Sequence, residues 1–156
     1  MPVVPARPGL DFVFRIRASI APARSGGPGR NGERLHIAIT GGTVDGPRLT
    51  GTIAAGGSDW PLVRPDGSSA ISARYTIVAA DGTPVYVRND GLRVSNPEVT
   101  ARLRAGDPVD PSEFYFRSAP VFEAPEGAHA WLNEAIFVAS LCRDADQVVV
   151  DVFRVT

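Results

Sequence analysis

An aspartate–tryptophan pair follows a double glycine and is the sharpest candidate for chemistry in the chain. In the segment Gly-Gly-Ser-Asp-Trp, the carboxylate of Asp59 stands beside the aromatic ring of Trp60. If Asp59 lies at the mouth of a pocket, partial burial raises its pKa and suits it to general acid–base catalysis. Trp60 would then help to bind the substrate. The structural alternative is that Asp59 caps a turn and Trp60 fills the core.

Two arginines flank an Asp-Gly turn in the middle of the chain. Arg74 precedes this turn, and Arg88 and Asn89 follow it. A guanidinium that points into a pocket binds a carboxylate, phosphate or enolate oxygen well. We therefore predict a catalytic role for Arg74 and substrate-binding roles for Arg88 and Asn89. The alternative is that both arginines point outward into solvent.

The last third of the chain holds two aromatic triplets, Tyr-Phe-Arg and Trp-Leu-Asn. Tyr115 and Arg117 share one face of a predicted strand, and Trp131 and Asn133 share one face of another. If these faces converge, a phenol, a guanidinium and a carboxamide surround an apolar wall and can stabilise a developing oxyanion. We predict that Tyr115 and Asn133 are catalytic and that Arg117 and Trp131 bind substrate. In the alternative, the rings belong to the core and Asn133 satisfies a bulge.

The composition excludes several kinds of chemistry. All 16 basic residues are arginine, so no lysine can form a Schiff base or anchor pyridoxal phosphate. One cysteine and two histidines cannot assemble the usual structural zinc sites. The chain has no nucleophile elbow for a Ser-His-Asp triad and no glycine-rich nucleotide motif. We expect no cofactor and no metal.

Length and charge point to one ordinary soluble domain spanning residues 1–156. The net charge of −1 gives no field that would attract nucleic acid or an anionic membrane. No apolar run approaches the roughly 20 residues needed to cross a bilayer, and the N-terminus does not read as a signal peptide. We expect a cytoplasmic protein with a small-molecule ligand or substrate as its partner, and homodimer formation as an open alternative.

Alternation of apolar and polar residues with a period of two is the dominant local pattern and predicts β-strands. The clearest hairpin turns at Asp81-Gly82, and one long strand is expected over residues 130–142. Asn96 and Pro97 predict the start of one short helix, which Gly106 ends. The Gly/Pro/Ser/Arg-rich segment 21–32 is expected to be a mobile loop.

About eight or nine strands with short connections and one short helix favour an all-β fold, a closed antiparallel up-and-down barrel. Closure is favoured because it removes exposed strand edges. A two-sheet sandwich is the alternative architecture. No internal repeat or second domain is visible.

An ordered set of short motifs covering roughly residues 10–155 resembles the family called domain of unknown function 3237. The motifs are Ile39-Thr40-Gly41-Gly42-Thr43, Gly46-Pro47-Arg48-Leu49-Thr50-Gly51, Gly56-Gly57-Ser58-Asp59-Trp60, Arg64-Pro65-Asp66-Gly67, Ala73-Arg74-Tyr75-Thr76, Val85-Tyr86-Val87-Arg88, Tyr115-Phe116-Arg117 and Trp131-Leu132-Asn133. The resemblance implies a compact β-barrel, similar in shape to the allene oxide cyclase and dirigent barrels, and leaves the chemistry open. Ser72 stands where the resemblance leads us to expect an acid in many relatives, so a catalytic role of that acid would be missing here.

These observations support two main hypotheses about function. The first is a cofactor-independent enzyme, an isomerase, cyclase, lyase or hydratase, that acts on a small organic molecule by acid–base and oxyanion chemistry. The second is a lipocalin-like barrel that binds a small molecule without catalysis. An oligomerising structural protein is a third interpretation.

Overall fold

Eleven strands form a single antiparallel sheet in the computed structural model, which describes residues 1–156. The long strands are β1 (Leu10–Ile20), β3 (Gly32–Asp45), β7 (Ser69–Ala79), β8 (Pro84–Val94), β9 (Tyr115–Glu123), β10 (Phe137–Asp144) and β11 (Gln147–Val155). The short strands are β2 (Arg24–Gly29), β4 (Gly51–Ile53), β5 (Gly57–Asp59) and β6 (Leu62–Val63). The helical segments are α1 (Pro97–Arg104) and the two 3₁₀ turns η1 (Pro111–Glu113) and η2 (Ala130–Asn133).

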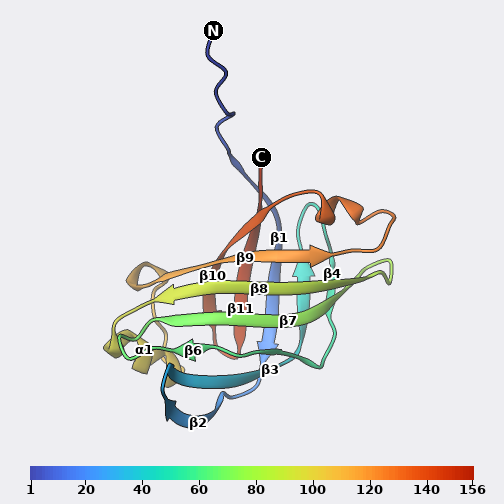
Figure 1. Cartoon of the computed structure of the whole chain (residues 1–156). Coiled ribbons are helices and arrows are strands. Elements are labelled where there is room, and N and C mark those ends of the chain that lie inside the picture. Colours follow the sequence, from blue (N-terminus) through green and yellow to red (C-terminus); the bar gives the residue numbers. More distant parts are fainter.

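The sheet closes into an eight-stranded barrel because β1 pairs with β11 on one side and with β3 on the other. Around the barrel the order is β1, β11, β10, β9, β8, β7, then the short strands β4, β5 and β6, and then β3. The three short strands together occupy one position, since each pairs with both β3 and β7. Figure 1 shows this arrangement, with α1 at one end of the barrel. The predicted all-β closed barrel with one α-helix is therefore confirmed.

Strict alternation of burial shows which side of each strand faces the barrel interior. On β7, Ile71, Ala73, Tyr75 and Ile77 are buried, whereas the residues between them are partly exposed. At the β7–β8 turn, Gly82 has a φ of 87° and the Asp81 carboxylate accepts a hydrogen bond from the Thr83 N–H at 3.0 Å. The hairpin that the Asp-Gly pair predicts is therefore observed, with the positive φ at Gly82 and not at Asp81.

Aromatic side chains fill the barrel at the end where β1 begins. The rings of Phe14 and Phe122 meet edge to face at 5.5 Å, and Phe122 meets Phe137 at 5.1 Å. Trp131 packs on the same group, with its ring 5.9 Å from that of Phe137. This end is a solid apolar core, so any open interior lies toward the other end.

The helix α1 covers part of that other end. Its N-cap is Asn96, whose side-chain oxygen accepts from the Val99 N–H at 2.8 Å, as the sequence predicts. The Thr100 hydroxyl donates to the carbonyl of Gly67 at 2.8 Å, and the Ser95 hydroxyl lies 2.8 Å from that of Thr100 and 3.3 Å from the same carbonyl oxygen. These buried contacts fix α1 against the loop that precedes β7. None of the helices has the length and apolar character needed to cross a bilayer.

Two expected elements differ from the structure. Residues 21–32 were expected to form a loop, but Arg24–Gly29 is the strand β2, which pairs with β3 as an exposed arm outside the barrel. Residues 130–142 were expected to form one strand, but the 3₁₀ turn η2 precedes β10, which begins only at Phe137. The strand β2 forms a hairpin with β3 although its residues are typical of a loop, and in η2 local backbone hydrogen bonds, such as that from the Leu132 N–H to the His129 carbonyl, form a turn where the residue pattern favours a strand.

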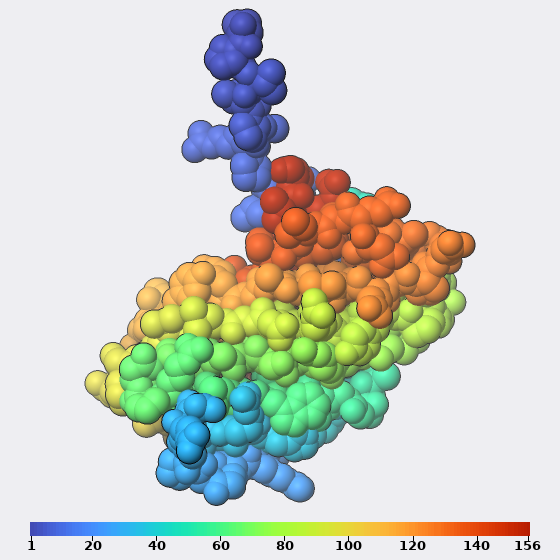
Figure 2. Space-filling view, viewed as in Figure 1, coloured from blue at the N-terminus to red at the C-terminus, as the bar shows by residue number.

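Residues before Gly9 stand away from the barrel as an extended arm. Figure 2 shows this arm projecting from the body next to the C-terminal strand. The pairing of the arm with the body begins at Gly9, whose N–H donates to the carbonyl of Thr156 at 3.2 Å. Val3 and Val4 are exposed.

Candidate functional site

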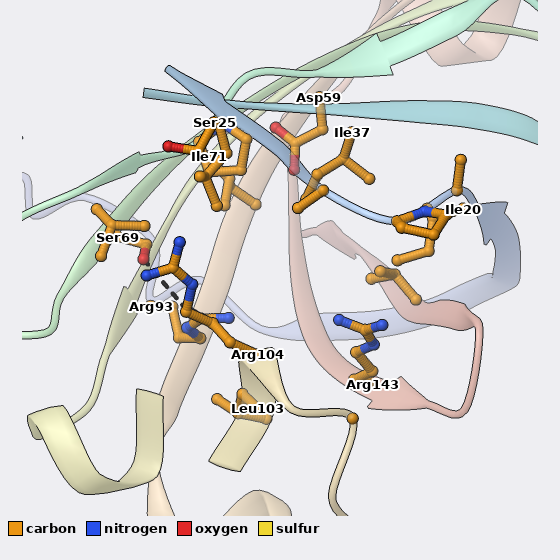
Figure 3. Close-up of a pocket in the computed structure, with 18 of the residues that line it drawn as sticks. Ile20, Ser25, Ile37, Asp59, Ser69, Ile71, Arg93, Leu103, Arg104 and Arg143 are labelled. Carbon is orange, nitrogen blue, oxygen red and sulfur yellow. Dashed lines mark hydrogen bonds between the residues drawn. The ribbon is translucent and has the colours of Figure 1, made fainter. Parts of the chain in front are cut away.

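A cavity of about 460 Å³ opens at the end of the barrel beneath α1. Its wall combines the end of β1, the strands β3, β5, β7 and β8, the turn between β10 and β11, and the last turn of α1. Its volume lies in the range of small-molecule sites, about 300–1,000 Å³. We call it the end cavity; Figure 3 shows the side chains that line it.

Asp59 provides a carboxylate to the upper wall of the end cavity in Figure 3. It is the last residue of β5, where it pairs with Ile37 of β3 and Ala73 of β7. Its Oδ1 accepts a hydrogen bond from the Ser72 N–H at 3.0 Å. Burial raises the pKa of Asp59, and the backbone N–H groups of Ser72 and Trp60 and the charge of Arg93 only partly oppose this effect. A carboxyl group in this condition can exchange a proton with a ligand at a higher pH than an exposed aspartate.

Arg93 reaches into the end cavity from the inner face of β8. One of its terminal nitrogens, Nη2, donates to the hydroxyl of Ser69 at 3.2 Å, whereas its buried Nε has no hydrogen-bond partner. Burial lowers the pKa of Arg93, and the charges of Arg143 and Arg104 lower it further. The protein therefore holds this guanidinium where its charge is incompletely compensated.

Arg104 and Arg143 complete a group of three cationic side chains around the cavity. Arg104, the last residue of α1, forms an ion pair with Glu33 at 2.9 Å. The Nε of Arg143, near the end of β10, donates to the carbonyl of Ala145 at 3.0 Å. In Figure 3 the guanidinium groups of Arg93 and Arg143 approach the same space from opposite sides.

A second polar group lies deeper in the barrel. Asn89 and Ser118 face the interior from β8 and β9, and the side-chain oxygen of each is buried without a hydrogen-bond partner. Asn89 pairs with Ala73, which on its other side pairs with Asp59. Adjacent strands are about 4.8 Å apart, so Asp59 and Asn89 stand roughly 10 Å apart, across the small side chain of Ala73. This row of paired residues has a polar side chain at each end and the small side chain of Ala73 between them.

Four of the residues that the sequence singles out point away from the cavity. Arg74 and Arg88 lie on the outer face of the barrel, where both pair with Asp90, at 3.3 and 3.7 Å. Tyr115 is 52% exposed, and the guanidinium of Arg117 lies over its ring at 5.5 Å. The expectation that these faces converge inside the barrel is therefore not met. The reason is parity: each of these residues follows or precedes a buried neighbour on its strand.

Three further candidates are also outside the end cavity. The ring of Trp60 is 41% exposed and lies against that of His36 at 5.7 Å. Trp131 belongs to the aromatic core at the opposite end, with the guanidinium of Arg48 over its ring at 4.2 Å. The side-chain amide of Asn133 brackets the backbone of Ala124, accepting from its N–H at 2.9 Å and donating to its carbonyl at 2.8 Å. The structure gives Trp131 and Asn133 packing and turn-closing contacts in place of the expected site.

Of the predicted site residues, the structure brings only Asp59 into the end cavity, and places Asn89 in the adjoining interior. Sequence reasoning missed Arg93, Arg104 and Arg143. A signal for Arg93 exists, because it shares the inward face of β8 with Val85, Val87 and Asn89. Arg104 and Arg143 reach the cavity through the docking of α1 and the β10–β11 turn, and local sequence carries no sign of that placement.

Comparison with known proteins gives one family. Residues 8–155 match the model of the family described as "Protein of unknown function (DUF3237)". A UPF0311 protein of Bradyrhizobium diazoefficiens is 42% identical over 95% of this chain and 98% of its own length. A conserved protein of unknown function from Rhodopseudomonas palustris has a similar crystal structure, with a TM-score of 0.93, 37% identity and coverage of 97% of this chain and 100% of that one.

A more distant solved structure shares the fold alone. It comes from Penicillium herquei and is described as an enzyme, with a TM-score of 0.74, 19% identity and full coverage of both chains. The family model and the bacterial relative each span nearly the whole barrel, including every strand that lines the end cavity. The chain therefore belongs to the DUF3237 family.

Proposed function

We propose that this barrel is a cofactor-independent enzyme that binds a small organic molecule in the end cavity and transfers a proton through Asp59. The observation that carries the proposal is the position of the Asp59 carboxylate on the wall of a ligand-sized cavity that arginine guanidinium groups also line. A proton-transfer group next to cations is the arrangement that enolisation, cyclisation and related reactions require.

The chemistry assigns one role to each group. Asp59, as a carboxylate, takes a proton from carbon or oxygen of the substrate, and the released electron pair moves onto a substrate oxygen. The positive potential of the arginines that line the cavity favours the negative charge that develops there. Returning the proton from Asp59 to a different atom gives an isomer or a cyclised product, with atoms and charge balanced. Hydrogen bonding from the Ser72 N–H holds the carboxylate in place during both steps.

The related barrel from Penicillium herquei is described as an enzyme, which supports the idea that this architecture accommodates catalysis. Its 19% identity carries no substrate or residue role to this chain. The proposed reaction type therefore rests on the residues of the end cavity.

Proton transfer can be tested without knowing the substrate, by incubating the full chain with a metabolite extract in D₂O. Mass spectrometry then follows compounds that gain deuterium or change in abundance. We expect the wild-type protein to act on a small set of compounds and Asp59→Asn to do so about 100-fold more slowly or worse, because general acid–base catalysis contributes roughly 10²–10⁴-fold. Asp11→Asn, an exposed change of the same kind on β1, is the matched control.

Equal labelling by the wild-type protein and Asp59→Asn would exclude Asp59 as the proton carrier. Absence of any change in the extract would exclude proton-transfer catalysis on the compounds present.

A non-catalytic binding barrel is the second candidate function, favoured by a cavity wall in which 11 of 21 residues are hydrophobic. Binding without deuterium uptake or product is the result that would establish it.

A further inference from the structure

Two of the three arginines that line the end cavity have no carboxylate within ion-pair distance. Arg104 has a carboxylate partner in Glu33, but Arg93 and Arg143 form no ion pair. Asp59 and Asp146 also line the cavity, yet neither is paired with an arginine.

Arg93 is the strongest indication of a missing partner. Its only side-chain hydrogen bond goes to the Ser69 hydroxyl, and its Nε is buried without an acceptor. Burial and the like charges of Arg143 and Arg104 disfavour its charged form, which lowers its pKa. A buried cation with like charges nearby costs free energy unless enough negative charge joins it, and the charge of Asp59 offsets this effect only in part. Buried charged groups with shifted pKa values are typical of binding sites.

We propose that the end cavity recognises an organic oxyanion, a carboxylate or a phosphate, that bridges Arg93 and Arg143. The proposal rests on the function proposed above and names the class of its substrate. Guanidinium groups suit this role because their planar fork of N–H donors matches two oxygens of a carboxylate or phosphate. Ile37, Ile71 and Phe116 supply an apolar wall for the remainder of the ligand.

The register of the strands sets the direction in which such a ligand lies. Arg93 pairs with Ser69 at the start of β7, whereas Asp59 pairs with Ala73, four residues further along the same strand. At about 3.3 Å per residue, the two backbone levels are roughly 13 Å apart, and the long arginine side chain shortens the distance between the charged groups. The oxyanion therefore binds near α1, and the reacting part of the ligand reaches inward to Asp59.

Charge-matched pairs of probes test this recognition on the full-length protein. Calorimetry measures binding of phenylacetate, of phenyl phosphate, and of the neutral phenylacetamide. We expect at least one anion to bind and the amide to bind about 10-fold or more weakly, since a charge-assisted hydrogen bond contributes about 1.5–3 kcal/mol, or roughly 10- to 150-fold. The phenylacetate and phenyl phosphate arms separate carboxylate from phosphate recognition.

Single substitutions locate the site. Arg93→Gln and Arg143→Gln are each expected to weaken anion binding about 10- to 100-fold. Arg17→Gln is the matched control: it removes the same charge from the outer face of β1 near the same end of the barrel, and its binding is expected to match wild type. Thermal melting shows that each variant is folded; Arg93→Gln is expected to keep or raise the melting temperature because it removes an uncompensated charge.

Three results would overturn the proposal: equal binding of phenylacetate and phenylacetamide, retention of anion binding in Arg93→Gln and Arg143→Gln, or no binding of either anion at millimolar concentration. The deuterium experiment is separate from these results. Loss of labelling in Asp59→Asn without anion recognition would leave the proposed function standing and refute this inference. Anion recognition together with full labelling in Asp59→Asn would support this inference and refute the proposed function.

Discussion

Asp59 differs from the other aspartates with shifted pKa values in the sign of its shift. Burial raises its pKa, whereas the pKa values of Asp66, Asp81 and Asp110 are lowered, mainly by hydrogen bonds from neighbouring groups. A carboxyl with a raised pKa in the folded state stabilises the fold most below its unfolded pKa of about 3.9, and this contribution is lost as the pH rises through the folded pKa. Ionised Asp59 is therefore a source of instability at neutral pH, as is common for catalytic groups.

The pH dependence of stability should reveal this cost. We expect Asp59→Asn to melt at or above the wild-type temperature at pH 7, because asparagine retains an oxygen for the Ser72 N–H but cannot ionise. The difference should shrink toward zero as the pH falls to about 4, near the unfolded pKa of an aspartate. Calorimetric melting of both proteins across this range measures it.

Asp66→Asn provides a control of opposite sign. Hydrogen bonds from the hydroxyl and the N–H of Ser68 lower the pKa of Asp66. The stabilising contribution of the Asp66 carboxylate is present above the unfolded pKa and is lost as the pH falls. The Asp66→Asn variant should therefore melt below the wild-type temperature at pH 7, and the two melting temperatures should converge in acid. An Asp59→Asn variant that behaves like Asp66→Asn would show that the Asp59 carboxylate is stabilising.

At the level of residues, sequence patterns identified Asp59 as a candidate but not the cations around it. The alternation on β7 already divides the strand into an apolar face that includes Ile71 and Tyr75 and a polar face that includes Arg74. Because the barrel is filled by apolar side chains, the apolar face turns inward and carries Arg74 outside. The inward face of β8 includes Arg93, but a charged residue at the end of an apolar face can lie in either solvent or a cavity.

Among the elements, β5 lies close against its neighbour β7 at the site. A Cβ atom on Gly57 would lie 2.5 Å from the Cβ of Tyr75 and 2.7 Å from the carbonyl oxygen of Arg74. The absence of a side chain at Gly57 therefore lets β5 lie against β7 and sets the position of Asp59, two residues later.

We expect Gly57→Ala to lower the free energy of unfolding by about 1–3 kcal/mol, the usual cost of overpacking, and to impair the activity that depends on Asp59. Gly26→Ala in β2 is the control: no atom lies within 4 Å of its added Cβ, so its effect should stay within about 0.5 kcal/mol. Urea unfolding measures both. Equal stability of the two variants would mean that β5 has room to shift.

The elements that sequence reasoning missed are those whose structure depends on contacts with a neighbouring segment outside the element itself. The strand β2 is composed of residues typical of loops, and its pairing comes from β3. The turn η2 contains aromatic and aliphatic residues typical of strands, but Asn133 ties it to the backbone at Ala124. Helix α1, in contrast, carries its own start and stop signals, and its bounds were predicted closely.

For the molecule as a whole, closure of the barrel depends on β1. This strand pairs with β3 and β11, and the side chain of Ile16 is fully buried where the three meet. We expect Ile16→Ala to cost about 2–5 kcal/mol of unfolding free energy, because the cavity left behind lies in a closed wall that cannot collapse easily. Leu10→Ala, on the same strand but 59% exposed, should change stability by less than about 0.5 kcal/mol.

Chemical denaturation of both variants provides the comparison. Similar losses of unfolding free energy for Ile16→Ala and Leu10→Ala would indicate that closure through β1 contributes little to cooperativity.

The barrel itself was predictable from the repeated alternation of apolar and polar residues and from the short connections between strands. Homodimer formation and a cytoplasmic location stay predictions, because they depend on contacts with other molecules and not on the fold.

The extended N-terminal arm gives the molecule a site for selective chemical labelling. The chain contains no lysine, so the terminal amino group is the one aliphatic amine that common acylating reagents can modify. It sits on the arm that leaves the start of β1, whereas the end cavity lies where β1 finishes. A fluorophore or a solid support can thus be attached at a single, defined point at the other end of the barrel from the end cavity. Dyes and sensor surfaces would report on the barrel without occupying it.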